Sequence, residues 1–159
     1  MDSTTYTHYI DFAYTTLLML WGGSLVGIGV IAVPFIFKFF ESTTEAAKLT
    51  SQIFRRQDLL IRVMAVCMLI LFYFKSKLDY SYQYGEWVTY VVILHFFIIY
   101  KLISRWLWKM REKIETFDTP TGDNPLRKKF QRWHRVARVL YAGQIAGVVL
   151  LLYLHAFGL

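Results

Sequence analysis

The stretch LRKKFQRWHRVARVLYAGQ, residues 126–144, contains six Lys or Arg side chains and one histidine, and leads into an apolar segment that begins at Val139. Basic residues at one end of an apolar helix are typical of the cytoplasmic end of a membrane span, where they contact anionic head groups. The apolar segment continues to Leu159 without a proline or a charged residue. We therefore expect a transmembrane helix at about residues 136–158.

Three further segments are apolar enough to cross a bilayer, at about residues 10–38, 58–75 and 86–108. About 20 residues of helix cover the ~30 Å hydrocarbon core. The second segment contains Arg62, which must extend toward the interface or find a partner. A soluble domain of this size would not bury a composition that is 56% hydrophobic. We predict an all-α integral membrane four-helix bundle that forms a single domain over residues 1–159.

The distribution of Lys and Arg predicts the orientation of the spans. All but Lys75 and Lys77 of the 18 Lys and Arg residues lie between Lys38 and Arg62 or between Lys101 and Arg138. The positive-inside rule then places these two connections in the cytoplasm and both termini outside. The net charge of +7 is expected to face anionic lipid head groups and not nucleic acid. The pattern suits a bacterial inner (plasma) membrane protein.

The two basic connections are expected to have structure of their own. In the first, Thr43 or Thr44 can cap a short helix that lies at the membrane interface. In the second, basic residues recur every four positions, so the third helix should continue past the membrane with one basic stripe. This stripe is a solvated or lipid-facing extension, or alternatively a docking surface for an acidic partner. Its members are Lys101, Arg105, Lys109 and Lys113.

Two pairs of glycines predict helix packing. Gly23 and Gly27 are four residues apart in the first span, and Gly143 and Gly147 are four apart in the fourth. Small residues at this spacing allow helix backbones to approach closely in a membrane. We expect the first and fourth helices to pack directly through these residues. The alternative is that one motif faces a second protomer of a homo-oligomer.

Pro34 and three polar side chains are further candidates. Pro34 lies within the first span, where it cannot donate to the Val30 carbonyl and should bend the helix. Gln144 is expected near the contact of the first and fourth helices. His95 lies in the middle of the third span, so it must find a hydrogen-bond partner, bind a ligand or stay neutral. His134 is expected to orient the basic end of the fourth helix near lipid phosphate or the first connection.

Metal or haem ligation is the alternative use of the histidines. His8, Asp11 and His155 should lie at the outer ends of the first and fourth helices, and an imidazole pair with a carboxylate suits zinc, copper(II) or iron. His95 or His134 could hold haem or copper. The soft side chains of the second span, Met64, Cys67 and Met68, would suit copper(I), although such residues commonly serve core packing.

No Ser-His-Asp order, phosphate loop, paired catalytic carboxylate or HExxH pattern occurs in the sequence. We therefore expect a non-enzymatic polytopic membrane protein. It would handle a small molecule or a metal ion, or serve as a subunit of a larger membrane complex. The alternative is a membrane redox protein that binds haem or copper.

Two segments, LWGGSLVGIGVIAVPFIF and FQRWHRVARVL, carry a family resemblance. They resemble the four-span family called domain of unknown function 4149, which is similar to human transmembrane protein 205. The matching residues are Trp21, Gly22, Gly23, Pro34, Phe37, Phe130, His134 and Arg135. The resemblance implies a membrane protein of undefined biochemical role, with metal or drug resistance suggested for some relatives. More distantly, the sequence looks like copper-resistance D proteins, which usually have a histidine where Tyr14 stands.

Overall fold

The computed structural model describes residues 3–77, 84–114, 116–118 and 124–157. Within these ranges the chain is helical and contains no strand. The elements in chain order are α1 (Ser3–Leu25), the π-helical segment η1 (Val26–Ala32), α2 (Val33–Phe39), α3 (Thr43–Lys77), α4 (Tyr84–Arg111) and α5 (Pro125–Phe157).

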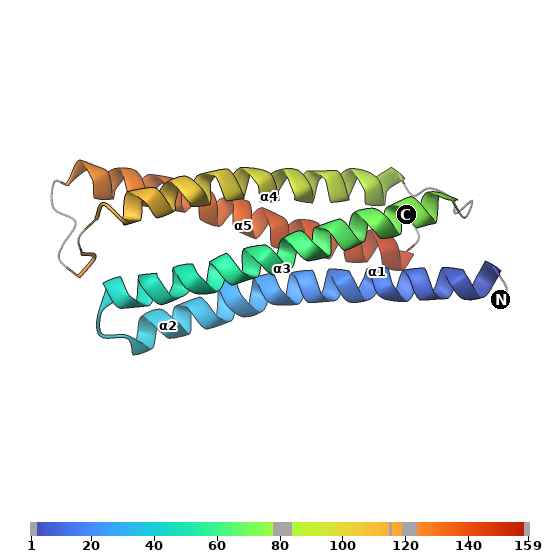
Figure 1. Ribbon diagram of the computed structural model, residues 1–159, viewed down its shortest axis with the longest axis horizontal. Helices are drawn as coiled ribbons and strands as arrows, with labels where there is room; N and C mark the ends of the chain where they lie inside the picture. The colour runs from blue at the N-terminus through green and yellow to red at the C-terminus, as the bar shows by residue number, and fades with distance from the viewer. Residues whose placement is uncertain (1–2, 78–83, 115, 119–123, 158–159) are drawn as a thin grey trace.

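The helices form a four-helix bundle (Figure 1), in which α1, η1 and α2 together make the first long helix. The bundle contains four helices that are long and apolar enough to cross a membrane. The start of α1 and the end of α5 lie at one end of the bundle, and the α2–α3 and α4–α5 connections lie at the other. The predicted all-α membrane bundle is therefore confirmed.

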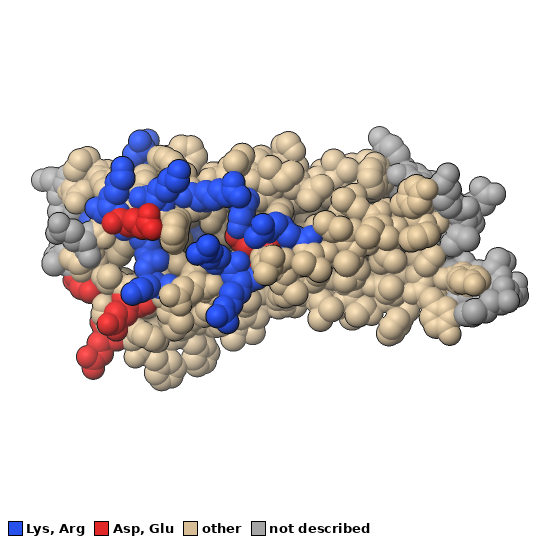
Figure 2. Space-filling model, in the orientation of Figure 1, with Lys and Arg blue, Asp and Glu red and all other residues tan. Residues whose placement is uncertain are grey.

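The Lys and Arg side chains gather over the half of the bundle that carries the α2–α3 and α4–α5 connections (Figure 2). We call this half the basic end. The described residues of the other half show almost no Lys, Arg, Asp or Glu side chain on the same face. The charge asymmetry of the sequence is thus an asymmetry along the bundle axis, which is the arrangement on which the positive-inside rule depends.

The first connection differs from its prediction. No separate interfacial helix follows α2, because α3 begins at Thr43 and continues without a break to Lys77. The Ser42 hydroxyl caps this helix by accepting a hydrogen bond from the Glu45 amide at 3.2 Å. Residues 43–77 contain neither Pro nor Gly, so nothing in the sequence interrupts the helix.

The third helix continues beyond the apolar span, as the basic stripe predicted. α4 extends to Arg111 and so includes three of the four stripe residues. After the break, α5 begins at Pro125, whose missing amide hydrogen is not needed in the first turn. The Asn124 side chain caps α5 by accepting hydrogen bonds from the amides of Leu126 at 3.0 Å and Arg127 at 3.3 Å.

The apolar core lies between the four helices. α4 packs along α5, and α1 packs against both α3 and α5. The ring of Phe72 contacts the rings of Tyr14, Trp87 and Tyr90 toward the end opposite the basic end. The core also includes Leu18, Trp21, Leu25, Met64, Met68, Ile93, Val148 and Leu151. Met64 and Met68 therefore fill the core, and Cys67 is only partly buried.

The first and fourth spans pack directly, but through other glycines than those predicted. A Cβ atom added at Gly22 would lie 3.0 Å from Val148, and one added at Gly29 would collide with the Tyr141 ring. A Cβ at Gly23 or Gly27 would meet nothing within 4 Å. The predicted use of Gly23 and Gly27 in this contact is therefore wrong, because these glycines point away from α5.

The glycines of the fourth span face α4. A Cβ at Gly147 would lie 2.5 Å from Ile93, while one at Gly143 would make an ordinary contact of 3.7 Å with Phe96. The expectation that Gly143 and Gly147 contact the first span is therefore wrong. Gly147 is instead the residue that lets the backbones of α4 and α5 come close.

Pro34 bends the first helix by a change of helix type. It lies at the start of α2, directly after the π-helical segment η1, in which the Val33 amide donates to the Ile28 carbonyl five residues earlier. Figure 1 shows α2 tilted from the axis of α1. A wider π turn is one of the known causes of such a bend, alongside proline itself.

Candidate functional site

A polar network joins three helices where α1 passes into η1. The Tyr141 hydroxyl of α5 donates to the Leu25 carbonyl at 2.8 Å. The Gln57 amide of α3 donates to the Ser24 carbonyl at 3.0 Å and to the Tyr141 oxygen at 3.1 Å. Gln57 is only 3% exposed, so these hydrogen bonds lie inside the bundle.

The π-helical segment explains why backbone oxygens are involved. In an α-helix the carbonyls of Ser24 and Leu25 would accept hydrogen bonds from amides four residues later. A change to five-residue spacing disturbs that pattern at the start of η1, and such π segments occur frequently at functional sites. In this protein the side chains of Gln57 and Tyr141 bond to these two carbonyls.

Gln144 lies one helical turn beyond Tyr141 on α5 and is 1% exposed. Neither Nε2 nor Oε1 of its amide has a hydrogen-bond partner among the described residues. The indole nitrogen of Trp21, a residue with 0% exposure, also lacks a partner there. Buried polar groups are nearly always hydrogen-bonded, so these atoms mark a place where another polar group would be stabilised.

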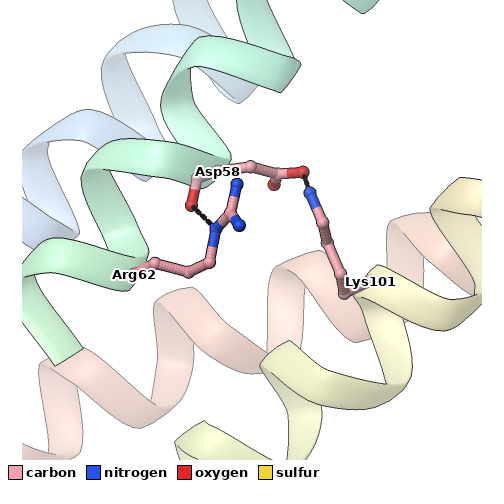
Figure 3. A network of polar contacts seen from close by, with 3 residues as sticks. All are labelled: Asp58, Arg62 and Lys101. Carbon is pink, nitrogen blue, oxygen red and sulfur yellow. Dashed lines mark hydrogen bonds and ion pairs between the residues drawn. The ribbon is translucent and has the colours of Figure 1, made fainter. Parts of the chain in front are cut away.

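A charged pair lies next to the network. Asp58 of α3 is 6% exposed and forms an ion pair with Lys101 of α4. Arg62 folds back along α3, and its Nε donates to the backbone carbonyl of Asp58 at 3.2 Å. Figure 3 shows the Arg62 guanidinium and the Lys101 ammonium on either side of the Asp58 residue. Arg62 therefore extends toward the basic end, as a cation in an apolar span should.

Side chains bridge α3 and α4 repeatedly toward the basic end. Beyond the Asp58–Lys101 pair, the guanidinium of Arg55 lies over the Trp108 ring at 6.0 Å. Further along, Arg111 donates to the Ser51 hydroxyl at 2.6 Å. These three bridges follow one antiparallel register, so the basic half of the α3–α4 contact is polar. On the opposite side of the pair, the Tyr90 hydroxyl donates to the Ala65 carbonyl at 2.8 Å.

The two basic connections are joined by Asp118. Its carboxylate accepts hydrogen bonds from the Ser42 hydroxyl at 3.0 Å, and from the Thr44 amide at 3.2 Å and hydroxyl at 2.9 Å. These hydrogen bonds, led by the one from the Thr44 side chain, lower the pKa of the Asp118 carboxyl below its usual value. Asp118 thus caps the start of α3 from the segment that follows α4.

The proposed metal group does not form. His8, Asp11 and His155 are all described, yet no group of three or more His, Cys, Asp or Glu side chains in the described part of the chain could hold a metal ion. His8 is exposed, whereas the His155 ring packs on Tyr14 with 4.7 Å between ring centroids. The outer ends of the first and fourth helices are neighbours, but this does not bring His8, Asp11 and His155 together as a metal site.

The remaining histidines lie on the outside of the bundle. His95 is exposed on α4. His134 is also exposed, and its ring stacks on Phe130 with 5.8 Å between the centroids. Neither position is enclosed by the bundle. The predicted roles of His134 at lipid phosphate and of either residue as a haem or copper ligand remain predictions.

Sequence reasoning identified Gln144 but not its polar neighbours. Gln57 and Asp58 lie at the very start of the second apolar segment, where polar side chains are common and indicate no particular site. Tyr141 is one of 11 tyrosines in the chain and carries no distinguishing pattern. A signal was present in Asp58, because a carboxylate at the edge of a span opposite Lys101 suggests an ion pair.

Comparison with known protein families, curated proteins and solved structures finds no match to this chain. The fold and the polar site therefore rest on the sequence and the structure. The resemblance to the domain of unknown function 4149 family stays a prediction.

Proposed function

We propose that this chain is a non-enzymatic polytopic membrane protein that handles a small polar molecule inside its helix bundle. The observation that carries the proposal is the Gln144 amide, which is buried and has no partner among the described residues. Leaving a buried polar group without a hydrogen bond costs about 1–3 kcal/mol. A molecule that offers both a donor and an acceptor would recover this free energy.

The surroundings of Gln144 support binding of a polar group. Tyr141, three residues earlier, presents its hydroxyl to the polar network on the same side of α5. The last two residues of α1, directly before the widened η1 segment, contribute the backbone carbonyls of this network. Discontinuous or widened helices that expose carbonyls within a bundle are a recurrent way to contact substrates in membrane proteins. No observation on the described residues favours haem or copper over this reading.

We place the protein in a bacterial inner membrane, with the basic end in the cytoplasm. The asymmetric distribution of Lys and Arg supports this orientation. Single cysteines at Lys109 and at Tyr9, introduced in a Cys67→Ser background, test it with a membrane-impermeant maleimide on intact spheroplasts. We expect the maleimide to label Tyr9→Cys and not Lys109→Cys. Labelling of Lys109→Cys and not Tyr9→Cys would show that the basic end lies outside the cell.

A second copy of the chain, or another membrane subunit, is the proposed partner. Gly23 of α1 and Gly27 of η1 support this, because a Cβ atom added at either position would meet nothing within 4 Å and small residues favour close helix contact. Oxidation of Gly23→Cys in a Cys67→Ser background should give a crosslinked dimer in membranes. A monomer under oxidation, with the thiol reactive to maleimide, would exclude a homodimer through this face.

Native mass spectrometry of protein extracted from its own membrane tests small-molecule handling. Wild-type protein should retain a non-covalent small molecule in stoichiometric amount. Gln144→Leu should lose it, because leucine has no hydrogen-bonding atoms. Gln52→Leu is the matched control, since Gln52 is exposed on α3, and it should retain the molecule.

A different result would contradict small-molecule handling. If wild-type protein carries no small molecule and Gln144→Leu raises the melting temperature, the buried amide is an internal cost that an apolar side chain relieves. This outcome would overturn the proposed function. It would leave the role of a subunit in a larger membrane complex.

A further inference from the structure

The Asp58–Lys101 ion pair between α3 and α4 has three further cations within one helical turn of its two residues. The ion pair joins Lys101 to Asp58, and Arg62 bonds to the backbone of Asp58 (Figure 3). Arg55 lies one helical turn before Asp58 on α3, and Arg105 lies one turn after Lys101 on α4. We call this group the α3–α4 cation cluster: Arg55, Arg62, Lys101 and Arg105.

The cluster has an excess of positive charge. Asp58 is the carboxylate that pairs with it, and this carboxylate is already engaged by Lys101. Among the described residues, neither Arg55 nor Arg105 has a carboxylate partner; Arg55 instead lies over the Trp108 ring. Like charges held together at the edge of an apolar region repel one another more strongly than they would in water. The arrangement therefore favours a bound anion.

The depth of the cluster indicates the source of that anion. Residues 63–74 of α3 and residues 87–100 of α4 contain no charged side chain. The cluster therefore stands where the apolar part of both helices ends, toward the basic end of the bundle. Lipid phosphates lie at this depth in a bilayer, and basic pockets between transmembrane helices are suited to anionic head groups.

The donors of the cluster suit an anion that presents two or more oxygens, as a phosphate group does. Arg62 uses Nε for the Asp58 carbonyl, so its two terminal nitrogens are available, and Arg105 makes no hydrogen bond to another described residue. Guanidinium groups offer paired donors whose spacing fits two phosphate oxygens. α3 and α4 are bridged here by long side chains, whereas α4 and α5 have closely packed backbones.

From these observations we infer that the α3–α4 cation cluster is a binding site for the phosphate group of an anionic phospholipid. The Arg55, Arg62 and Arg105 guanidinium groups bind the phosphate oxygens, and Asp58 holds Lys101 beside them. This site is distinct from the Gln144 amide. Loss of a small molecule in Gln144→Leu says nothing about it, so the two proposals fail independently.

The test uses purified full-length protein in a neutral detergent. Melting temperature is followed while one of four probes is titrated: phosphatidylglycerol, phosphatidylcholine, oleate or inorganic phosphate. The variant is Arg105→Gln, because Arg105 is exposed and has no described contact that the fold needs. The control is Lys109→Gln, which removes the same charge from the same basic stripe one turn away.

Phosphatidylglycerol is expected to raise the melting temperature saturably in wild-type protein and in Lys109→Gln. Arg105→Gln should bind it about tenfold or more weakly, because one charge-assisted hydrogen bond contributes about 1.5–3 kcal/mol. Phosphatidylcholine, oleate and phosphate should have little effect at matched concentration. This pattern supports a phospholipid site.

Four results would overturn the inference. Equal weakening in Arg105→Gln and Lys109→Gln would indicate general attraction to a charged surface. An equal effect of oleate would indicate an anion site without preference for phosphate. Saturable binding of inorganic phosphate, without an added effect of the lipid, would assign the site to a soluble phosphate compound. Absence of any shift with phosphatidylglycerol would remove the site altogether.

Discussion

Asp58 of α3 and Lys101 of α4 form a buried ion pair at the level where Gln57 bonds to Tyr141 and to the Ser24 carbonyl. Gln57 and Asp58 are adjacent in the sequence but reach different partners, since one contacts α1 and α5 and the other contacts α4. α3 is therefore linked to every other span at one level of the bundle. The larger apolar cluster lies on one side of this level, and a smaller apolar cluster between α4 and α5 lies toward the basic end.

The ion pair predicts a non-additive response to mutation. Lys101→Met leaves the Asp58 carboxylate buried without its cation, which should destabilise the protein by about 3 kcal/mol. The double variant Asp58→Asn with Lys101→Met removes both charges and should recover most of that loss. Thermal unfolding of these two variants and of Asp58→Asn alone, in one detergent, measures the coupling between the side chains. Losses that simply add would show that the two side chains do not interact.

Substitution of glycine by alanine is predicted to lower stability at some positions and not at others. Gly147→Ala should destabilise the bundle by about 1–3 kcal/mol, because the new methyl group must displace Ile93. Gly29→Ala should also destabilise, since it displaces the Tyr141 ring and with it the hydrogen bond to Leu25. Gly23→Ala and Gly143→Ala, whose new atoms meet open space or ordinary contacts, serve as controls. A melting temperature as low in Gly23→Ala as in Gly147→Ala would contradict this packing.

Asp118 predicts a response to acid. Its pKa is lowered in the folded protein, so its stabilising contribution is complete above the ordinary carboxyl pKa of about 4 and is lost as the pH falls through the lowered value. Asp118→Asn should lower the melting temperature at neutral pH. It should also reduce the further loss seen on acidification below about pH 4.

The control for Asp118 is Glu112→Gln, which removes an exposed carboxylate just after α4. It should leave the melting temperature at neutral pH nearly unchanged. If Asp118→Asn and Glu112→Gln had the same acid profile, the hydrogen bonds from Ser42 and Thr44 would not stabilise the link between the two connections.

The sequence predicted those features that depend on one helix at a time. Span positions and the extension of α4 follow from local composition and from the four-residue spacing of basic residues. The unbroken α3 was missed, because the polar stretch before Gln57 was read as a separate helix although no Pro or Gly divides it. Continuous helical propensity was the better guide there.

Features that depend on helix rotation could not be predicted from one sequence. Gly22 and Gly23 are adjacent, and only the rotation of α1 decides that Gly22 meets Val148 while Gly23 faces outward. The same uncertainty led to the incorrect metal group of His8, Asp11 and His155. Gln144, which was predicted near the contact of the first and last spans, is buried on α5. The network of Gln57 and Tyr141 required three helices to be in register.

The packing of α1 against α5 is tested most directly by disulfide formation between Gly22→Cys and Val148→Cys in a Cys67→Ser background. The Cβ position at Gly22 lies 3.9 Å from the Val148 Cβ, within the usual Cβ–Cβ range of about 3.5–4.5 Å for a disulfide. Mild oxidation in membranes should crosslink this pair within one polypeptide and should leave the Gly23→Cys, Val148→Cys pair uncrosslinked. If the Gly23 pair crosslinks and the Gly22 pair does not, while all the thiols react with maleimide, α1 is rotated differently and the polar site does not exist as described.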